Sequence, residues 1–230
     1  AERFASGVTR LGYMVITGAG PGIMEAAQGG AGRARSFGVN IRLPFESKAN
    51  EVIQDDPKLI HFKYFFTRKV CFLKETDAVV IFPGGFGTHD EAFESLTLVQ
   101  TGKSHLVPIV FVDRPGGTYW SDWLKYIRKH LVDSGYVDGF DESLFQVTTS
   151  VDEAVATVDR FYLNYHPCRY VRPLQVIRLK HPVSDELLKR LNRDFRDITV
   201  AGSIERLPCA LEPEIDEPEA LDLYRIAFRF

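Results

Sequence analysis

The feature that most constrains the fold is a wholly apolar segment, residues 78–82, that runs directly into the glycine-rich turn Pro83-Gly84-Gly85-Phe86-Gly87. Strands that are apolar on both faces are typical of parallel sheets covered by helices on each side. A glycine turn between such a strand and a following helix is typical of the ligand-binding edge of an α/β sheet. The segment therefore predicts an α/β protein built on parallel strands.

Strand and helix patterns alternate along the first 165 residues. Short apolar runs predict the strands, and amphipathic spacing predicts the helices. The alternation indicates a doubly wound, Rossmann-like parallel sheet with helices on both faces. Strands are expected at 13–16, 37–43, 78–82, 106–112 and 144–148, and helices at 4–11, 23–35, 61–75, 88–100, 119–131 and 150–162, with a polar loop at 45–58.

The pattern changes after residue 165, so we expect two domains, 1–165 and 166–230. The second contains a predicted strand at 174–179, a helix at 185–195 and strand-like alternation at 221–230. It is interpreted as a small α+β extension, and the sequence predicts no role for it. Because a doubly wound domain usually begins with a strand and this chain begins with a helix pattern, we expect one strand and its loop to precede residue 1.

Composition excludes several classes of protein. A net charge of −3 does not favour an electrostatic nucleic-acid binder, and the apolar runs are shorter than a membrane helix requires. Three widely spaced cysteines, Cys71, Cys168 and Cys209, indicate free thiols in a reducing compartment, so a cytoplasmic protein is predicted. The histidines are also scattered, and no metal site is expected; those considered were His61, His89 and His105.

The first glycine turn, with Gly18, Gly20 and Gly22, also follows a predicted strand and precedes a helix. Unpaired amides at a helix start favour an anion, so this turn and the second could face one ligand. An NAD site is disfavoured, because position 23 is Ile and the next strand ends Ile41-Arg42-Leu43-Pro44 without an acidic residue. A tight turn that binds nothing fits this segment equally well.

The second turn is more specific. It lacks the Lys-Ser/Thr pair of a Walker motif, whereas Thr88 can donate its hydroxyl to a phosphate at the helix start. Glu91 is expected on the first turn of the helix, facing the same crevice. The alternative is a capping box, in which Thr88 caps the helix and Glu91 bonds back to its amide. On local sequence alone, capping is the better interpretation of Glu91.

A third element is the basic pair Arg68-Lys69 on an aromatic-rich predicted helix. A solvated basic pair on a helix surface is common. This helix, however, runs into the strand that carries the second glycine turn, which favours a role for the pair beside that turn.

The combination resembles the LONELY GUY family, whose members are cytokinin riboside 5′-monophosphate phosphoribohydrolases and have often been mislabelled as lysine decarboxylases. The resemblance is to the longer bacterial members and covers residues 1 to about 160. The motifs that carry it are Gly20-Pro21-Gly22-Ile23-Met24-Glu25-Ala26-Ala27, Arg68-Lys69, and Pro83-Gly84-Gly85-Phe86-Gly87-Thr88 with Glu91.

The resemblance implies a site in residues 1–165 that binds a nucleoside 5′-monophosphate and hydrolyses its N-glycosidic bond to free base and ribose 5-phosphate. Arg68 and Glu91 would be the catalytic pair, with Lys69 and Glu25 near the nucleotide. No metal or organic cofactor is implied, and a homodimer or a higher homo-oligomer is expected. The residues implied to hold the 5′-phosphate are Gly84, Gly85, Gly87 and Thr88.

Several alternatives stay open at this point. The base could be that of AMP, of a cytokinin riboside monophosphate, or of another purine or pyrimidine nucleotide. A non-catalytic protein that binds a nucleotide or the molybdenum cofactor is the main rival. An NAD(P) oxidoreductase and an amino-acid decarboxylase are less favoured, the latter because no lysine stands out as a Schiff-base site.

Overall fold

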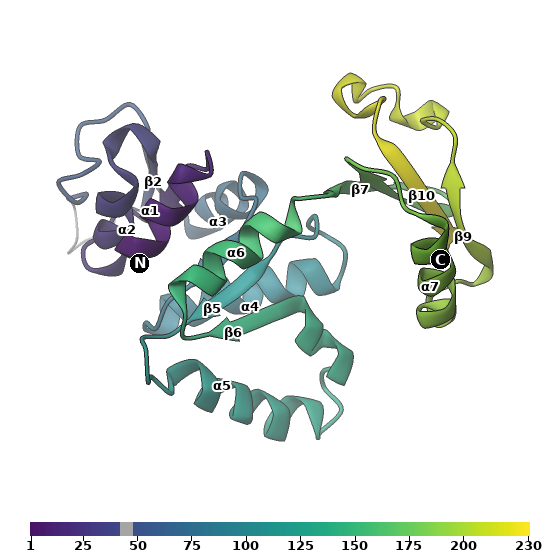
Figure 1. Cartoon of the computed structure of the whole chain (residues 1–230). Helices are drawn as coiled ribbons and strands as arrows, with labels where there is room; N and C mark the ends of the chain where they lie inside the picture. Colours follow the sequence, from purple (N-terminus) through teal and green to yellow (C-terminus); the bar gives the residue numbers. More distant parts are fainter. Residues whose placement is uncertain (42–47) are drawn as a thin grey trace. The chain divides into compact units, whose positions relative to one another are not determined.

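The structure is a computed structural model that describes residues 1–41 and 48–230 (Figure 1). Its residues form two compact units, Ala1–Asp159 and Arg160–Phe230. The predicted end of the second strand at Arg42-Leu43-Pro44 lies outside the described residues. Among the described helices, none is both long enough and apolar enough to cross a membrane.

The first unit contains parallel strands arranged in two three-stranded sheets. This confirms the predicted α/β class of parallel strands flanked by helices. The strands are divided between two sheets. The first sheet has the order β1 (Val15–Thr17), β2 (Ser36–Ile41), β3 (Leu59–Phe62), and the second has the order β4 (Val79–Ile81), β5 (Ile109–Val112), β6 (Phe145–Thr148).

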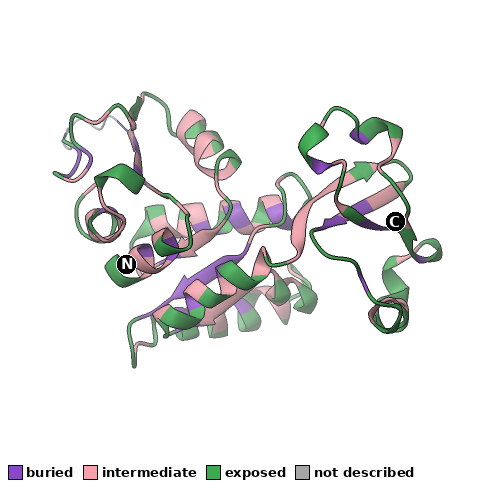
Figure 2. Ribbon diagram, turned by 45° about the horizontal axis from the view of Figure 1, so that its top comes forward, coloured by how far each residue is buried: buried purple, intermediate pink, exposed green. Residues whose placement is uncertain are grey.

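The second sheet is covered on both faces. Every residue of β5 is buried (Figure 2), and because successive side chains of a strand point to opposite faces, Ile109 and Phe111 pack on one side and Val110 and Val112 on the other. The first face packs against α4 (Phe86–Gln100) and α5 (Tyr119–Ile127), and the second against α1 (Glu2–Arg10) and α6 (Val151–Phe161). The remaining helices of this unit are α2 (Ile23–Ala31) and α3 (Phe65–Lys74), with a π-helical turn at Arg128–Val132 and short 3₁₀ helices at Arg33–Arg35 and Gly139–Leu144.

The predicted helix at 61–75 is wrong at its beginning. Residues 59–62 form β3, and the helix starts only at Phe65. His61 and Phe62 lie beside Asn40 and Ile41 of β2 in a parallel ladder. Pairing with a neighbouring strand satisfies these backbone groups, and this tertiary contact outweighs the local amphipathic pattern.

Helices α1 and α2 approach each other closely at Gly30. A Cβ built on Gly30 would lie 2.1 Å from the backbone carbonyl oxygen of Glu2, whereas one built on the adjacent Gly29 meets nothing within 4 Å. A backbone oxygen cannot turn aside as a flexible side chain can. The contact between the two helices therefore requires glycine at position 30.

We predict that Gly30→Ala lowers the free energy of unfolding by about 1–3 kcal/mol, the usual cost of overpacking. Gly29→Ala is the matched control: it has room for the methyl group and gains helix propensity, so its stability should equal or exceed the wild-type value. Urea unfolding followed by circular dichroism measures both. Equal midpoints for the two variants would contradict the close packing.

The second unit is an antiparallel sheet with one α-helix. Its strand order is β7 (Tyr165–Val171), β8 (Leu174–Leu179), β10 (Tyr224–Arg229), β9 (Ala201–Leu207), and α7 (Asp185–Asp194) packs on it through leucines. Strands β7 and β9, which are the edge strands, were not predicted from the sequence. β7 contains Pro167 and β9 is mostly exposed, so neither shows the apolar pattern of a central strand. Short 3₁₀ helices lie at Arg196–Ile198, Glu212–Glu214 and Pro218–Ala220.

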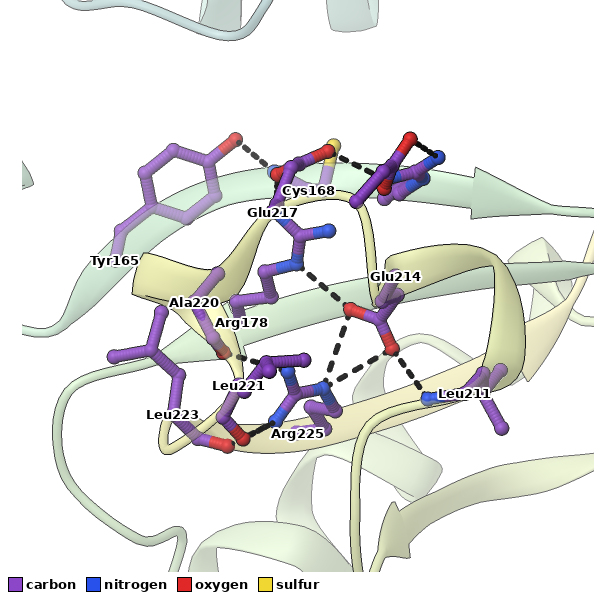
Figure 3. A network of polar contacts seen from close by, with 12 residues as sticks. Tyr165, Cys168, Arg178, Leu211, Glu214, Glu217, Ala220, Leu221, Leu223 and Arg225 are labelled. Carbon is purple, nitrogen blue, oxygen red and sulfur yellow. Dashed lines mark hydrogen bonds and ion pairs between the residues drawn. The ribbon is translucent and has the colours of Figure 1, made fainter.

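A buried carboxylate lies between two buried arginines in this unit (Figure 3). Glu214 accepts hydrogen bonds from Arg178 Nε at 2.8 Å, from Arg225 Nε at 3.1 Å and from the Leu211 amide at 2.9 Å. Arg178 also pairs with Glu217. Burial by itself raises the pKa of Glu214, but these hydrogen bonds outweigh it, so the pKa lies below its ordinary value.

We predict that Glu214→Gln costs about 3–5 kcal/mol of stability at neutral pH, because it leaves two buried guanidinium groups without their shared counter-charge. Glu212→Gln, at an exposed position in the same turn, should be close to neutral. The folded-state pKa of Glu214 is depressed, so its contribution is present above the unfolded-state pKa and is lost as pH falls. Urea unfolding at several pH values should therefore show the difference between wild type and Glu214→Gln shrinking below about pH 4.

Candidate active site

The carbonyl groups of the first glycine turn are held by Asn50, which lies 30 residues beyond Gly20 in the chain. Asn50 donates its amide N–H to the Ala19 carbonyl at 2.9 Å and its side-chain Nδ2 to the Gly20 carbonyl at 3.0 Å. It also donates to the buried Gln28 at 2.7 Å. The carbonyls of this turn are therefore fixed by protein contacts, and Gly22, with φ of 73°, is the N-cap of α2.

The predicted ligand-facing glycines of this turn lie beneath a methionine. A Cβ on Gly18 would lie 2.9 Å from Met24 Sδ, and one on Gly20 would lie 2.6 Å from the Met24 methyl group. The same Gly18 position is 3.7 Å from a terminal nitrogen of Arg68, so this turn adjoins the basic helix. Glu25, in contrast, makes no hydrogen bond or ion pair within the described part of the chain.

The second turn begins its helix earlier than predicted. Helix α4 starts at Phe86 with Gly85 as its N-cap, and no side chain caps it. Thr88 is therefore inside the helix and Glu91 lies on the second turn, so the expected start at residue 88 and the placement of Glu91 on the first turn are wrong. The capping-box interpretation of Thr88 and Glu91 is also wrong.

The geometry of this turn leaves room above its backbone. The amides of Thr88 and His89 bond to the Gly85 carbonyl, at 3.0 and 3.3 Å. No acceptor is found among the described residues for the amides of Phe86 and Gly87, as is usual for the first residues of a helix. A Cβ on Gly85 or Gly87 would meet nothing within 4 Å, whereas one on Gly84 would collide with the Thr88 hydroxyl at 2.1 Å.

Arg68 and Glu91 meet beside this turn. Arg68 Nη2 on α3 donates to Glu91 Oε1 on α4 at 3.2 Å, and both side chains are largely buried. The Arg68 guanidinium also lies over the Phe65 ring, 5.1 Å from its centre. Arg68 Nε is buried and has no hydrogen-bond partner in the described structure, so one donor of the fork remains to be satisfied.

Lys69 places a second positive charge near the Glu91 carboxylate. Its Nζ lies 2.8 Å from Asp90, 2.5 Å from Glu94 and 3.9 Å from Glu91 Oε2. Burial raises the pKa of Glu91 above its ordinary value, and the charges of Lys69 and Arg68 reduce this rise without cancelling it. The structure thus brings together Arg68, Lys69 and Glu91, as expected from the sequence.

Tyr119 was not predicted to belong to the site, and no role at the turn was predicted for His89. Tyr119 Oη donates to the Gly84 carbonyl at 2.6 Å, and His89 Nε2 lies 2.7 Å from Tyr119 Oη. Tyr119 is the first residue of α5, 35 positions from Gly84. No local pattern signals such a contact, because it is created only when α4 and α5 pack on the same sheet face.

No group of three or more metal-ligating side chains suited to an ion occurs among the described residues. The cysteines Cys71, Cys168 and Cys209 are free thiols.

A family model described as "Possible lysine decarboxylase" matches residues 23–158, which is more than half of the chain and includes the second glycine turn, Arg68 and Glu91. The chain belongs to this family. The match confirms the resemblance to the LONELY GUY proteins, which have often carried that older description.

Among individual relatives, the chain is 35% identical over 101 residues to a cytokinin riboside 5′-monophosphate phosphoribohydrolase of Mycobacterium tuberculosis (strain ATCC 25618 / H37Rv). The match covers 44% of this chain and 52% of the relative, so the chain spans about half the length of the curated relative it matches.

Among solved structures, the molybdenum cofactor binding protein of the phototrophic bacterium Rippkaea orientalis matches with a TM-score of 0.45 and 16% identity, over 70% of this chain and 84% of that one.

We predict that Lys69→Met raises the pKa of Glu91 further. The substitution removes a positive charge that favours the carboxylate and leaves Asp90 and Glu94, which disfavour it. A carbon-13 NMR titration of the Glu91 carboxyl group measures the change. Lys74→Met, at an exposed position on the same helix, is the control and should leave this pKa unchanged. A pKa that falls in Lys69→Met would contradict the proposed charge balance.

Proposed function

We propose that this protein hydrolyses the N-glycosidic bond of a nucleoside 5′-monophosphate to release the free base and ribose 5-phosphate. The observation that carries the proposal is the ion pair of Arg68 and Glu91, 3.2 Å apart, beside a helix start with open space above its glycines. Family membership and the printed name of the Mycobacterium tuberculosis relative support the same reaction.

The 5′-phosphate is assigned to the second turn. The amides of Phe86 and Gly87 point to no protein acceptor within the described residues, and the positive end of the α4 dipole lies there. Thr88 adds a hydroxyl, and the glycines at 84, 85 and 87 keep side chains away from the ligand. Anchoring the phosphate uses binding energy remote from the reacting bond to orient that bond.

Glu91 is assigned the chemical step. Cleavage of an N-ribosidic bond develops positive charge on the ribose, which a carboxylate stabilises. Water adds to C1′ as the bond from C1′ to the base nitrogen breaks, and the water gives a proton to Glu91. The leaving base takes up a proton from solvent, and Glu91 returns its proton to solvent. A carboxylate whose pKa is raised by burial is better matched to proton transfer near neutral pH than an exposed one.

Arg68 is assigned to hold the substrate in place. Its planar guanidinium is always charged, so it can donate to a ribose or phosphate oxygen. Its proximity to Gly18 allows the first turn, with Gly20 and Gly22, to line the same ligand. Lys69 and Glu25 complete the assigned set, Lys69 by balancing the charge on Glu91.

The wider assignments belong to the same proposal. The substrate is AMP or a cytokinin riboside 5′-monophosphate, no cofactor takes part, and the protein is a cytoplasmic homodimer or higher homo-oligomer. Residues 1–165 form the nucleotide-binding domain, and the 166–230 extension has no assigned role.

We predict that Glu91→Gln lowers the rate of adenine release from AMP by about 10²–10⁴-fold, the range for loss of a general base. Binding of ribose 5-phosphate should stay near the wild-type value, because Gln keeps the shape of the side chain. Chromatography of released adenine and calorimetry of ribose 5-phosphate binding measure the two effects. Glu75→Gln, an exposed carboxylate at the end of α3, is the control.

The alternative function is a protein that binds a nucleotide or the molybdenum cofactor without catalysis. An assay of the wild-type protein distinguishes this function from hydrolysis. Nucleotide binding without base release from any nucleoside 5′-monophosphate in a panel would support the alternative. Wild-type activity that persists in Glu91→Gln would instead reduce Glu91 to a structural partner of Arg68.

A further inference from the structure

The phosphate-binding turn is fixed by a side chain from a distant helix. Tyr119 Oη donates to the Gly84 carbonyl at 2.6 Å. The Gly84 carbonyl belongs to the peptide group that joins Gly84 to Gly85, and Gly85 is the N-cap of α4. The Tyr119 hydroxyl therefore acts on the peptide group immediately before the amides assigned to phosphate.

Planarity of the peptide converts this contact into an orientation of the neighbouring amide. The peptide between Gly84 and Gly85 is trans, so its C=O and N–H point in opposite directions. With the oxygen held toward Tyr119, the Gly85 N–H faces away from Tyr119. Glycines on both sides of this peptide would otherwise leave it unusually free to rotate.

His89 sets the direction of the Tyr119 hydroxyl. A phenol has one hydrogen, and this one is donated to the Gly84 carbonyl, so the His89 Nε2 at 2.7 Å must be the donor to Tyr119 Oη. His89 lies on α4 itself, only four residues beyond Gly85. The contacts thus run from α4 through Tyr119 back to the turn that begins α4.

The start of α5 is itself held rigidly, which gives Tyr119 a defined position. Asp113, at the end of β5, accepts hydrogen bonds from the Arg114 and Trp120 amides at 2.7 and 3.4 Å. A Cβ on Gly117 would lie 2.3 Å from the Asp113 carboxylate, so this loop closes tightly around it. The fully buried Trp120 next to Tyr119 anchors the helix in the core.

We propose that Tyr119 and His89 are positioning residues that hold the Gly84–Gly85 peptide with its N–H available to the 5′-phosphate of the substrate. This inference rests on the proposed function. It adds to the site two side chains that contact no part of the substrate and act only through the orientation of the turn.

The test compares Tyr119→Phe with Tyr126→Phe. Both remove one hydroxyl and keep the ring, and Tyr126 lies on the same helix with its ring beside His130 and away from the turn. We expect Tyr119→Phe to raise the KM for AMP and the Kd for ribose 5-phosphate by about two- to tenfold, the range for one lost hydrogen bond. The kcat should change less, and Tyr126→Phe should match wild type.

A second pair of variants tests the donor role of His89. Gln can place an amide N–H near the position of Nε2, whereas Leu cannot donate at all. We expect His89→Leu to reproduce the weaker ribose 5-phosphate binding of Tyr119→Phe, and His89→Gln to restore it toward wild type. A role of His89 in packing alone would give the same binding constant for both variants.

The outcomes separate this inference from the proposed function. If wild type releases no base from any nucleoside 5′-monophosphate, the proposed hydrolysis fails. The Kd values of Tyr119→Phe and Tyr126→Phe for ribose 5-phosphate then still test the positioning role. If wild type is active and Tyr119→Phe has the KM and Kd of Tyr126→Phe, the positioning role is overturned. Circular dichroism of each variant verifies that it is folded before binding is measured.

Discussion

The ion pair between Arg68 and Glu91 is the contact on which the candidate site depends. It joins α3, which follows the first sheet, to α4, which follows β4 of the second sheet. An ion pair withdrawn from water gains little net stability, because desolvation offsets the attraction. Its value lies in geometry: a guanidinium with an unsatisfied donor and a carboxylate of raised pKa are held together before any ligand arrives.

In both glycine turns, a side chain from a distant segment donates a hydrogen bond to a backbone carbonyl. The donor is Asn50 in the first turn and Tyr119 in the second. The first amide groups of the following helix have no acceptor among the described residues. Glycine permits the tight approach, but it also makes the backbone pliable, so a turn that must present amides in one direction needs such external support.

The sequence predicted the parts of the fold that depend on local patterns. The apolar core strands and most helices follow from periodicity, and the meeting of Arg68 with Glu91 follows from the resemblance to the LONELY GUY family. The edge strands β7 and β9 and the strand β3 did not, because their residues are set by pairing with a neighbour. Tyr119 was missed for a related reason. Its contact with Gly84 forms only when two helices pack on one sheet face, and no local sequence pattern indicates that packing.

The charged core of the second unit limits which amino-acid replacements that unit tolerates. Arg178, Glu214 and Arg225 share one network, so the cost of replacing one depends on whether the others are present. Replacement of Glu214 alone leaves the buried Arg225 without a carboxylate partner, whereas a joint replacement by apolar residues of similar volume removes the charges together. The three positions are therefore expected to vary as a set, with intermediates of low stability separating the ionic core from an apolar one.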